Sequence, residues 1–158
     1  MKNLRNHITE TLKESKIEGF EFLRLTDYEN VLHSLEKFLT LGKQNLKDNW
    51  LWESFKEEFC IEGDSLEIIP YLIDSSQSYY FIASEENSKY WVAQGTGEAI
   101  QEVIKSMHYF EYYIVDKKFN WLICENHHNI LIGTGTVIEK MKERMNKIRF
   151  RERSNPES

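Results

Sequence analysis

The stretch that decides the fold runs from residue 109 to residue 135 and reads YFEYYIVDKKFNWLICENHHNILIGTG. It contains three runs rich in aromatic and β-branched residues, which favour the half-buried surface of a sheet. These runs are EYYIVD (111–116), WLICEN (121–126) and ILIG (130–133). Short polar segments at 116–120 and 127–129 separate them. We therefore expect three antiparallel strands joined by tight turns.

The second of these runs predicts which residues share a face of the sheet. Successive side chains of a strand point to opposite faces. One face would then hold Trp121, Ile123 and Glu125, and the other Leu122, Cys124 and Asn126. Both faces are mainly apolar until the run ends, which indicates a central strand covered by helices on one side and partly by loops on the other.

The rest of the chain alternates helical and strand patterns. Apolar residues at helical spacing predict four helices, at 3–17, 26–41, 98–107 and from Thr136 to about 148. Apolar and β-branched runs predict three more strands, at 66–73, 79–84 and 89–94. Phe20 and Phe22 begin a short segment that is either a strand or an extended linker. Pro70 lacks an amide proton, so we expect the 66–73 strand at a sheet edge or with a bulge.

Together these elements predict one α+β domain over residues 1–153, followed by a frayed polar tail at 154–158. About six mostly antiparallel strands would pack against helices in two layers. The 158 residues are enough for a single domain with its own core.

Two features of the composition predict where the protein acts. No run of about 18 apolar residues occurs, and the N-terminus lacks the apolar centre of a signal peptide, so no membrane association is expected. Cys60 and Cys124 are too few for a disulfide scaffold. We expect two buried, reduced thiols in a cytoplasmic protein.

Charge is unevenly distributed along the chain. Residues 139–153 carry seven Lys/Arg and three Asp/Glu, a net of +4, whereas the whole chain carries −6. The remainder is therefore −10, which argues against direct binding to nucleic acid. The basic segment has two interpretations, a solvated helix end with favourable dipole interactions or a binding helix.

Residues 43–64 form the strongest candidate for a partner-binding surface. Aromatic residues alternate there with acidic ones, and the candidates are Trp50, Trp52, Glu53, Glu57, Glu58, Glu62 and Asp64. One interpretation is an amphipathic turn or helix that packs its aromatics inward, since Phe55 and Phe59 are at helical spacing. The other is a set of aromatic anchors with an acidic rim, which suits a basic protein partner.

Catalytic and metal chemistry has weaker support. Cys124, His127 and His128 are the candidates for a zinc site or a cysteine nucleophile, because thiolate and imidazole bind zinc. Strand alternation separates Cys124 from Glu125, and adjacent histidines in a turn are expected to diverge. No CxxC, HxxxH or G-x-S-x-G motif occurs. We therefore assign no catalytic residue, no metal and no cofactor.

Two Gly-Thr-Gly segments, at 95–97 and 133–135, each precede a predicted helix. Helix N-termini can bind phosphate, but neither segment belongs to a GxxxxGK[ST] or GxGxxG motif. Glycine and threonine are also the residues that a strand-to-helix turn with an N-cap requires. We therefore interpret both segments as turns.

The 109–135 stretch also resembles a known group of proteins. Its segments FEYY (110–113), WLICENHH (121–128) and IG (132–133) are similar to a run in small uncharacterised proteins of Bacillus-like bacteria. The arrangement also resembles immunity proteins of polymorphic toxin systems, including the SUKH superfamily. That resemblance covers about 30 residues. It implies a cytoplasmic, non-enzymatic protein that binds and blocks a toxin domain.

The resemblance and the acidic composition lead to one main functional hypothesis. The chain would be an immunity-type inhibitor of a basic toxin, such as a nuclease, with acidic residues facing the toxin's basic site. Two alternatives remain open, a regulatory or scaffold module with another partner and an enzyme that uses the Cys124–His128 turn. The oligomeric state is not predicted.

Overall fold

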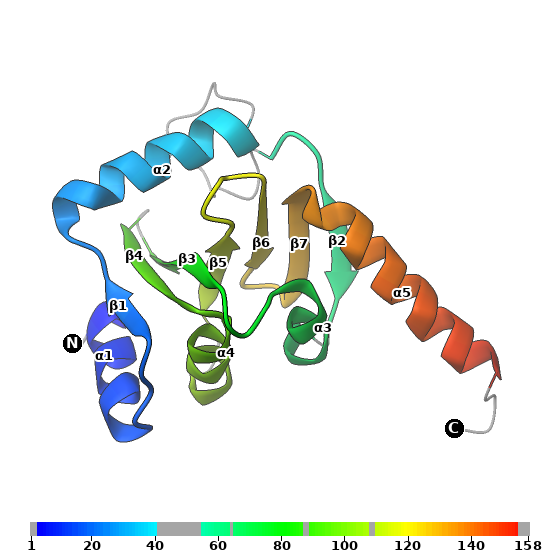
Figure 1. Cartoon of the computed structure of the whole chain (residues 1–158), viewed down its shortest axis with the longest axis horizontal. Coiled ribbons are helices and arrows are strands. Elements are labelled where there is room, and N and C mark those ends of the chain that lie inside the picture. Colours follow the sequence, from blue (N-terminus) through cyan, green and yellow to red (C-terminus); the bar gives the residue numbers. More distant parts are fainter. Residues whose placement is uncertain (1–2, 41–54, 64, 87–88, 108–109, 155–158) are drawn as a thin grey trace.

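The computed structural model describes residues 3–40, 55–63, 65–86, 89–107 and 110–154. Within them, a seven-stranded antiparallel sheet has helices on both faces (Figure 1). The strands are β1 (Phe20–Phe22), β2 (Phe59–Glu62), β3 (Ser78–Glu85), β4 (Lys89–Thr96), β5 (Glu111–Val115), β6 (Trp121–Glu125) and β7 (Ile130–Gly135). The helices are α1 (Leu4–Glu14), α2 (Leu25–Leu39), α3 (Ser65–Leu72), α4 (Gly97–Ser106) and α5 (Val137–Ser154). The predicted α+β class is confirmed.

The strand order across the sheet is β1-β4-β3-β5-β6-β7-β2. The last three long strands, β5, β6 and β7, form the meander predicted for residues 109–135. The preceding strands differ, because α4 carries the chain from β4 over β3 to β5. The two short strands β1 and β2 close the two edges of the sheet. Together with five of the six expected strands, they make up the seven strands of the described residues.

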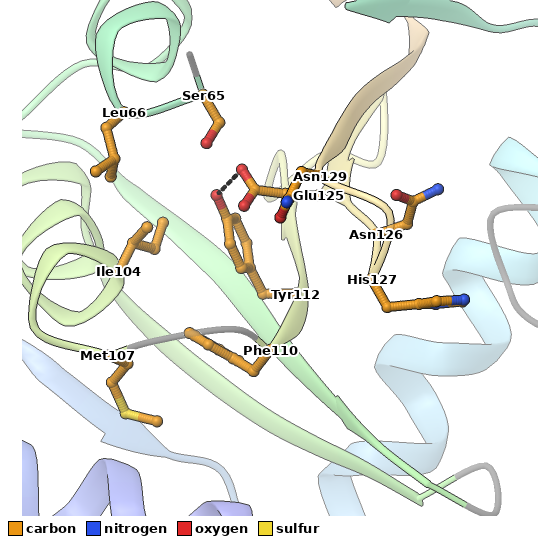
Figure 2. Close-up of a pocket in the computed structure, with 10 residues that line it drawn as sticks. All are labelled: Ser65, Leu66, Ile104, Met107, Phe110, Tyr112, Glu125, Asn126, His127 and Asn129. Carbon is orange, nitrogen blue, oxygen red and sulfur yellow. Dashed lines mark hydrogen bonds between the residues drawn. The ribbon is translucent and has the colours of Figure 1, made fainter. Parts of the chain in front are cut away.

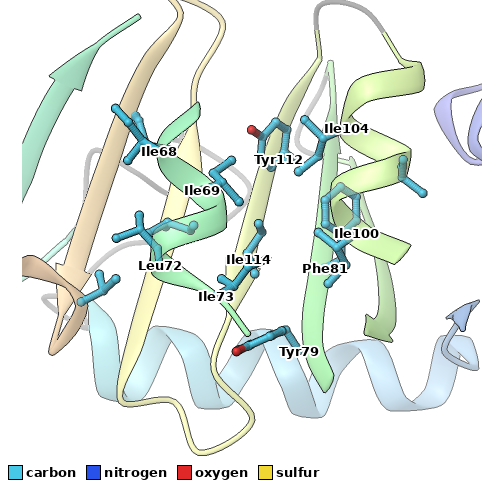
Figure 3. Packing of buried hydrophobic residues seen from close by; sticks show 14 of the residues in the cluster. Ile68, Ile69, Leu72, Ile73, Tyr79, Phe81, Ile100, Ile104, Tyr112 and Ile114 are labelled. Carbon is cyan, nitrogen blue, oxygen red and sulfur yellow. The ribbon is translucent and has the colours of Figure 1, made fainter. Parts of the chain in front are cut away.

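Most of the core lies on the face covered by α1, α3, α4 and α5. There α3 and α4 lie over β3, β5 and β6 (Figure 3). The fully or nearly buried residues at this contact include Ile68, Ile69, Leu72, Ile100, Phe81, Ile114 and Ile123. Burial of apolar area at this face supplies the main driving force for its formation.

The other face of the sheet is covered by α2, which crosses it on the opposite side from α3 and α4 (Figure 1). The helix buries Tyr28, Val31, Leu35 and Leu39. They pack with Val92, Tyr113, Leu122 and Cys124 of the sheet. The domain therefore has a third layer beyond the two that were expected. The alternation predicted for β6 is confirmed, since Ile123 and Cys124 lie in different clusters.

The prediction of a strand at 66–73 is wrong, because residues 65–72 form the helix α3. Its buried residues Ile68, Ile69 and Leu72 have the spacing of one helix face, while Leu66 and Tyr71 are exposed. Pro70 lies inside the helix and is exposed. The fixed φ of proline is compatible with a helix, and the loss is one hydrogen bond and some steric strain.

The helical interpretation of Phe55 to Phe59 is also wrong. Phe55 is buried beside α2 and forms an isolated bridge with Thr40, whereas Phe59 begins the edge strand β2. Strand alternation turns Ile61 into the core and leaves Cys60 exposed, so the expectation of two buried thiols holds only for Cys124. Pairing with β7 overrides the local spacing of the aromatic residues.

Helix α4 begins with a side-chain N-cap, whereas α2 begins without one. Thr96 is the N-cap of α4, and its side-chain oxygen accepts a hydrogen bond from the Ala99 amide at 3.1 Å. This confirms the N-cap expected there. The turn interpretation of the two Gly-Thr-Gly segments is wrong, because Gly95 and Thr96 end β4, Gly97 begins α4 directly, and residues 133–135 belong to β7. In contrast, α2 begins at Leu25 without a side-chain cap at Arg24. Among the described residues, no helix is long and apolar enough to span a membrane.

Candidate functional site

A cavity of about 280 Å³ opens at one end of the sheet, on the face that carries α3 and α4 (Figure 2). Tyr112 of β5 and Glu125 of β6 lie at its floor, and Ser65 lies at the start of α3 above them. The wall is apolar and consists of Leu66, Ile104, Met107 and Phe110. A concave site with apolar walls and a few convergent polar groups is the usual form of a ligand site.

Strand pairing explains why the two floor residues meet. Tyr112 and Glu125 are directly opposite each other in the β5–β6 ladder. Side chains that are opposite in an antiparallel pair lie on the same face and close together. Ser65 joins them because α3 crosses β6 and β7 on that face. The N-terminal end of α3 and the C-terminal end of α4 thus complete the cavity.

The floor contains a hydrogen bond between two side chains. The Tyr112 hydroxyl donates to Oε2 of Glu125 at 3.2 Å, and Ser65 lies above the pair (Figure 2). Burial, followed by the nearby Glu125 carboxylate, raises the pKa of the Tyr112 hydroxyl well above its ordinary value. Tyr112 therefore remains a neutral donor at physiological pH. Its hydrogen bond orients the carboxylate within the cavity.

The turn between β6 and β7 forms one rim of the cavity. Asn126 is buried, and its Oδ1 accepts hydrogen bonds from the amides of His128 at 3.0 Å and Ile130 at 3.1 Å. Asn129 closes the turn with a φ of 60°, a left-handed conformation that asparagine tolerates better than most residues. The asparagines at both ends therefore shape this turn.

His127 and His128 do not diverge as expected, since their ring centroids are 4.0 Å apart. Figure 2 shows the His127 ring pointing away from the Tyr112–Glu125 pair. Its Nδ1 lies 3.4 Å from Oε1 of Glu111, a buried carboxylate that also accepts a hydrogen bond from Tyr113 at 3.0 Å. His127 thus connects to the Glu111 carboxylate on the face covered by α2.

Cys124 is also on that second face and is fully buried. Burial, with a contribution from the Glu111 carboxylate, raises the pKa of its thiol well above the ordinary value. An inaccessible thiol with a raised pKa is a poor nucleophile. Among the residues that the structure describes, no three His, Cys, Asp or Glu side chains are grouped so that they could hold a metal ion.

The predicted partner-binding residues fall into two sets. Trp50, Trp52, Glu53 and Asp64 lie outside the described residues. Glu57, Glu58 and Glu62 are exposed at the edge strand β2. Glu62 pairs with Ile130, and the next residue, Gly63, donates its amide to the Asn129 carbonyl at 3.2 Å. Glu62 therefore lies at the same end of the sheet as the cavity, but its side chain is on the α2 face, like that of its partner Ile130. Glu57 and Glu58 precede the other end of β2.

The cavity itself was not predicted from the sequence. The sequence placed Glu125 on the correct face of β6, and that position at the end of an apolar strand was the available signal. Leu66 was missed because residues 66–73 were interpreted as a strand, and Ser65 lay just outside that strand. No pattern in the sequence showed that this segment would cover Tyr112.

Fold and site together define a small α+β domain with a carboxylate-floored cavity at one end of its sheet. The chain belongs to a family of unknown function, DUF6756, whose model matches residues 1–148. The match thus includes every residue that lines the cavity. Searches of curated proteins and of solved structures found no match to this chain.

Proposed function

We propose that this chain is a non-enzymatic protein-binding domain that acts as an immunity-type inhibitor of a basic toxin, such as a nuclease. The observation that carries the proposal is the acidic character of the cavity end. Glu125 lies at the floor, Glu62 is exposed at the end of β2, and Glu67 is exposed in the first turn of α3. No lysine or arginine is among the described residues that line the cavity.

An acidic surface of this kind favours a basic partner for two physical reasons. The surrounding chain, without the basic segment 139–153, carries a net charge of −10 and attracts cationic proteins over several ångströms. Complementary charge also raises the association rate and suppresses binding of acidic competitors. The apolar wall beside Glu125 supplies the contact area that a purely charged surface lacks.

A capture experiment with charge-reversed variants tests the proposal. Tagged wild-type protein would be exposed to a lysate of the source organism, and bound proteins would be identified by mass spectrometry. We expect one basic protein in near-stoichiometric amount, with at least about tenfold less on Glu62→Lys and a smaller decrease on Glu57→Lys, because like charges oppose binding. Glu14→Lys is the matched control, since Glu14 is exposed at the end of α1, near the opposite edge of the sheet (Figure 1).

Two results would contradict the proposal. Equal capture by wild type and Glu62→Lys would remove the acidic cavity end from the interface. Capture of acidic or neutral partners alone would rule out a basic toxin as the partner. A captured basic protein must also lose its toxic activity when it is mixed with the wild-type chain, because a scaffold module would leave that activity unchanged.

A further inference from the structure

We propose that the cavity over Tyr112 and Glu125 binds the side chain of a lysine or arginine that the partner inserts into it. The alkyl stem would lie along Leu66, Ile104, Met107 and Phe110, and the cationic group would pair with Glu125. The statement that this side chain belongs to a basic partner protein rests on the proposed function. The preference of the cavity for a cation does not depend on that function.

The polar groups of the floor favour a cation. The Glu125 carboxylate receives one hydrogen bond, from Tyr112 through Oε2, and no lysine, arginine or histidine in the described part of the chain forms an ion pair with it. A carboxylate with acceptor capacity in a partly enclosed site attracts a cation more strongly than an exposed one, since water screens the pair less. An anionic ligand would face Glu125, and the lining residues that the structure describes include no lysine or arginine to offset that repulsion.

The wall favours an alkyl chain attached to that cation. Ile104 is 7 % exposed and Leu66 is 50 % exposed, so the apolar wall extends from the core to the surface. Figure 2 shows Leu66 and Ile104 on one side of the Tyr112 ring, with Phe110 and Met107 below it. Lysine and arginine bury their methylene stems along such surfaces while the charged group seeks a polar partner.

The size of the cavity suits a single side chain. Its volume of about 280 Å³ is below the range of roughly 300–1,000 Å³ that is common for drug-sized ligands. A wholly apolar occupant would exclude solvent from the Glu125 carboxylate and offer it no compensating positive charge, which is costly. Arginine is enriched among the residues that dominate binding energy at protein interfaces.

The first arm of the test uses small probes and needs no partner. The full chain, labelled with ¹⁵N, would be titrated at constant pH with butylammonium and propylguanidinium, which reproduce the two side chains. We expect saturable amide shifts concentrated at Ser65, Leu66 and residues 126–129, with dissociation constants in the millimolar range. Neutral butanol and anionic butyrate should bind at least about tenfold more weakly, because neither carries the positive charge that forms an ion pair with the carboxylate.

Variants identify the residue responsible. Glu125→Gln preserves the shape and the Tyr112 hydrogen bond but removes the charge, and we expect at least about tenfold weaker butylammonium binding. Glu98→Gln is the matched control on the exposed first turn of α4, at the end of that helix away from the cavity, where we expect less than about twofold change. Unchanged binding by Glu125→Gln, or equal binding of butanol and butylammonium, would overturn the inference.

The second arm distinguishes failure of this inference from failure of the proposed function. If wild type and Glu125→Gln capture a basic partner equally, the proposed function stands. The inference that the partner inserts a lysine or arginine into the cavity is then overturned. If butylammonium binds in the cavity but no basic protein is captured, the proposed function fails. The cavity is then a site for a free amine. The inference that a partner protein supplies the bound side chain is overturned. Loss of both butylammonium binding and partner capture in Glu125→Gln supports the inference.

Discussion

Two hollows flank α3 on the same face of the sheet, and a buried tyrosine lines each of them. At the N-terminal end of α3, the Tyr112 hydroxyl donates to the Glu125 carboxylate inside the cavity. At the C-terminal end, the Tyr79 hydroxyl accepts a hydrogen bond from the backbone amide of Asp74 at 2.8 Å. One hydroxyl thus orients a side chain toward a cavity, and the other completes the turn that follows α3.

The second hollow has the larger volume, about 390 Å³, yet it is the weaker candidate for a site. Asp74, Asp116 and Lys140 line it, so charges of both signs are present. The Asp74 carboxylate already accepts hydrogen bonds from the amide and the hydroxyl of Ser76. Volume alone therefore does not identify a binding site. In the first cavity, the Glu125 carboxylate has acceptor capacity left for a ligand. In the second hollow, the polar groups of Tyr79 and Asp74 already bond to the turn that follows α3.

The largest expected effect concerns the C-terminal end of α3. Gly97 begins α4 against the turn after α3, and an added Cβ would collide with the carbonyl oxygen of Asp74. Because that neighbour is backbone, Gly97→Ala should lower the free energy of unfolding by about 3 kcal/mol. Urea unfolding measures this, with Ser106→Ala in the last turn of α4 as the control. An unchanged midpoint would show that the turn yields easily.

The next effect compares the two tyrosines directly. Tyr79→Phe leaves the Asp74 amide without its acceptor and should cost about 1.5 kcal/mol of stability. Butylammonium binding at the other end of α3 should not change. Thermal or urea unfolding and the amine titration together check both statements. Weakened amine binding in this variant would mean that the two hollows are coupled through α3.

Tyr112→Phe should show the reverse pattern. The half-buried Glu125 carboxylate can exchange the lost donor for water, so the stability should change by less than about 1 kcal/mol. Butylammonium affinity should decrease about threefold to tenfold, because the carboxylate loses its orientation. A large loss of stability with unchanged affinity would make Tyr112 a structural residue like Tyr79.

The smallest expected effect depends on pH and concerns the Asp74 carboxylate, which lies at the C-terminal end of α3. Hydrogen bonds from Ser76 lower the pKa of Asp74 below its ordinary value. A lowered pKa in the folded state stabilises the fold above the unfolded-state pKa, and the contribution disappears as the pH falls through the folded-state pKa. The stability difference between wild type and Asp74→Ala should therefore be largest at neutral pH and shrink on acidification. Urea unfolding at several pH values measures the trend, and a difference that grows in acid would contradict it.

The sequence predicted the central part of the fold well, because local signals there agree with the tertiary context. In the 109–135 stretch, aromatic and β-branched runs alternate with polar turns, and β5, β6 and β7 follow them closely. Thr96 lies at the N-cap of α4 for a similarly local reason. The sequence failed at 65–72, where a run of apolar residues with an internal proline is compatible with a strand or a helix by composition alone.

The candidate site was less predictable, because its residues come from three separate segments. Glu125 and Tyr112 lie in predicted strands, but their pairing depends on the register between β5 and β6. Ser65 reaches them only because α3 is a helix that crosses the sheet. The histidines that attracted attention in the sequence belong to the turn at the rim, and Cys124 belongs to the opposite face.

The sequence by itself determined the α+β class, the meander at its centre and the acidic character of the chain outside its last helix. These follow from side-chain periodicity, turn chemistry and charge, which act over a few residues or simply add up. Only the tertiary structure decided that α3 is a helix, that β2 closes the sheet and that Glu125 lies at the floor of a cavity. Those outcomes depend on contacts between residues far apart in the chain, whose burial outweighs local preference.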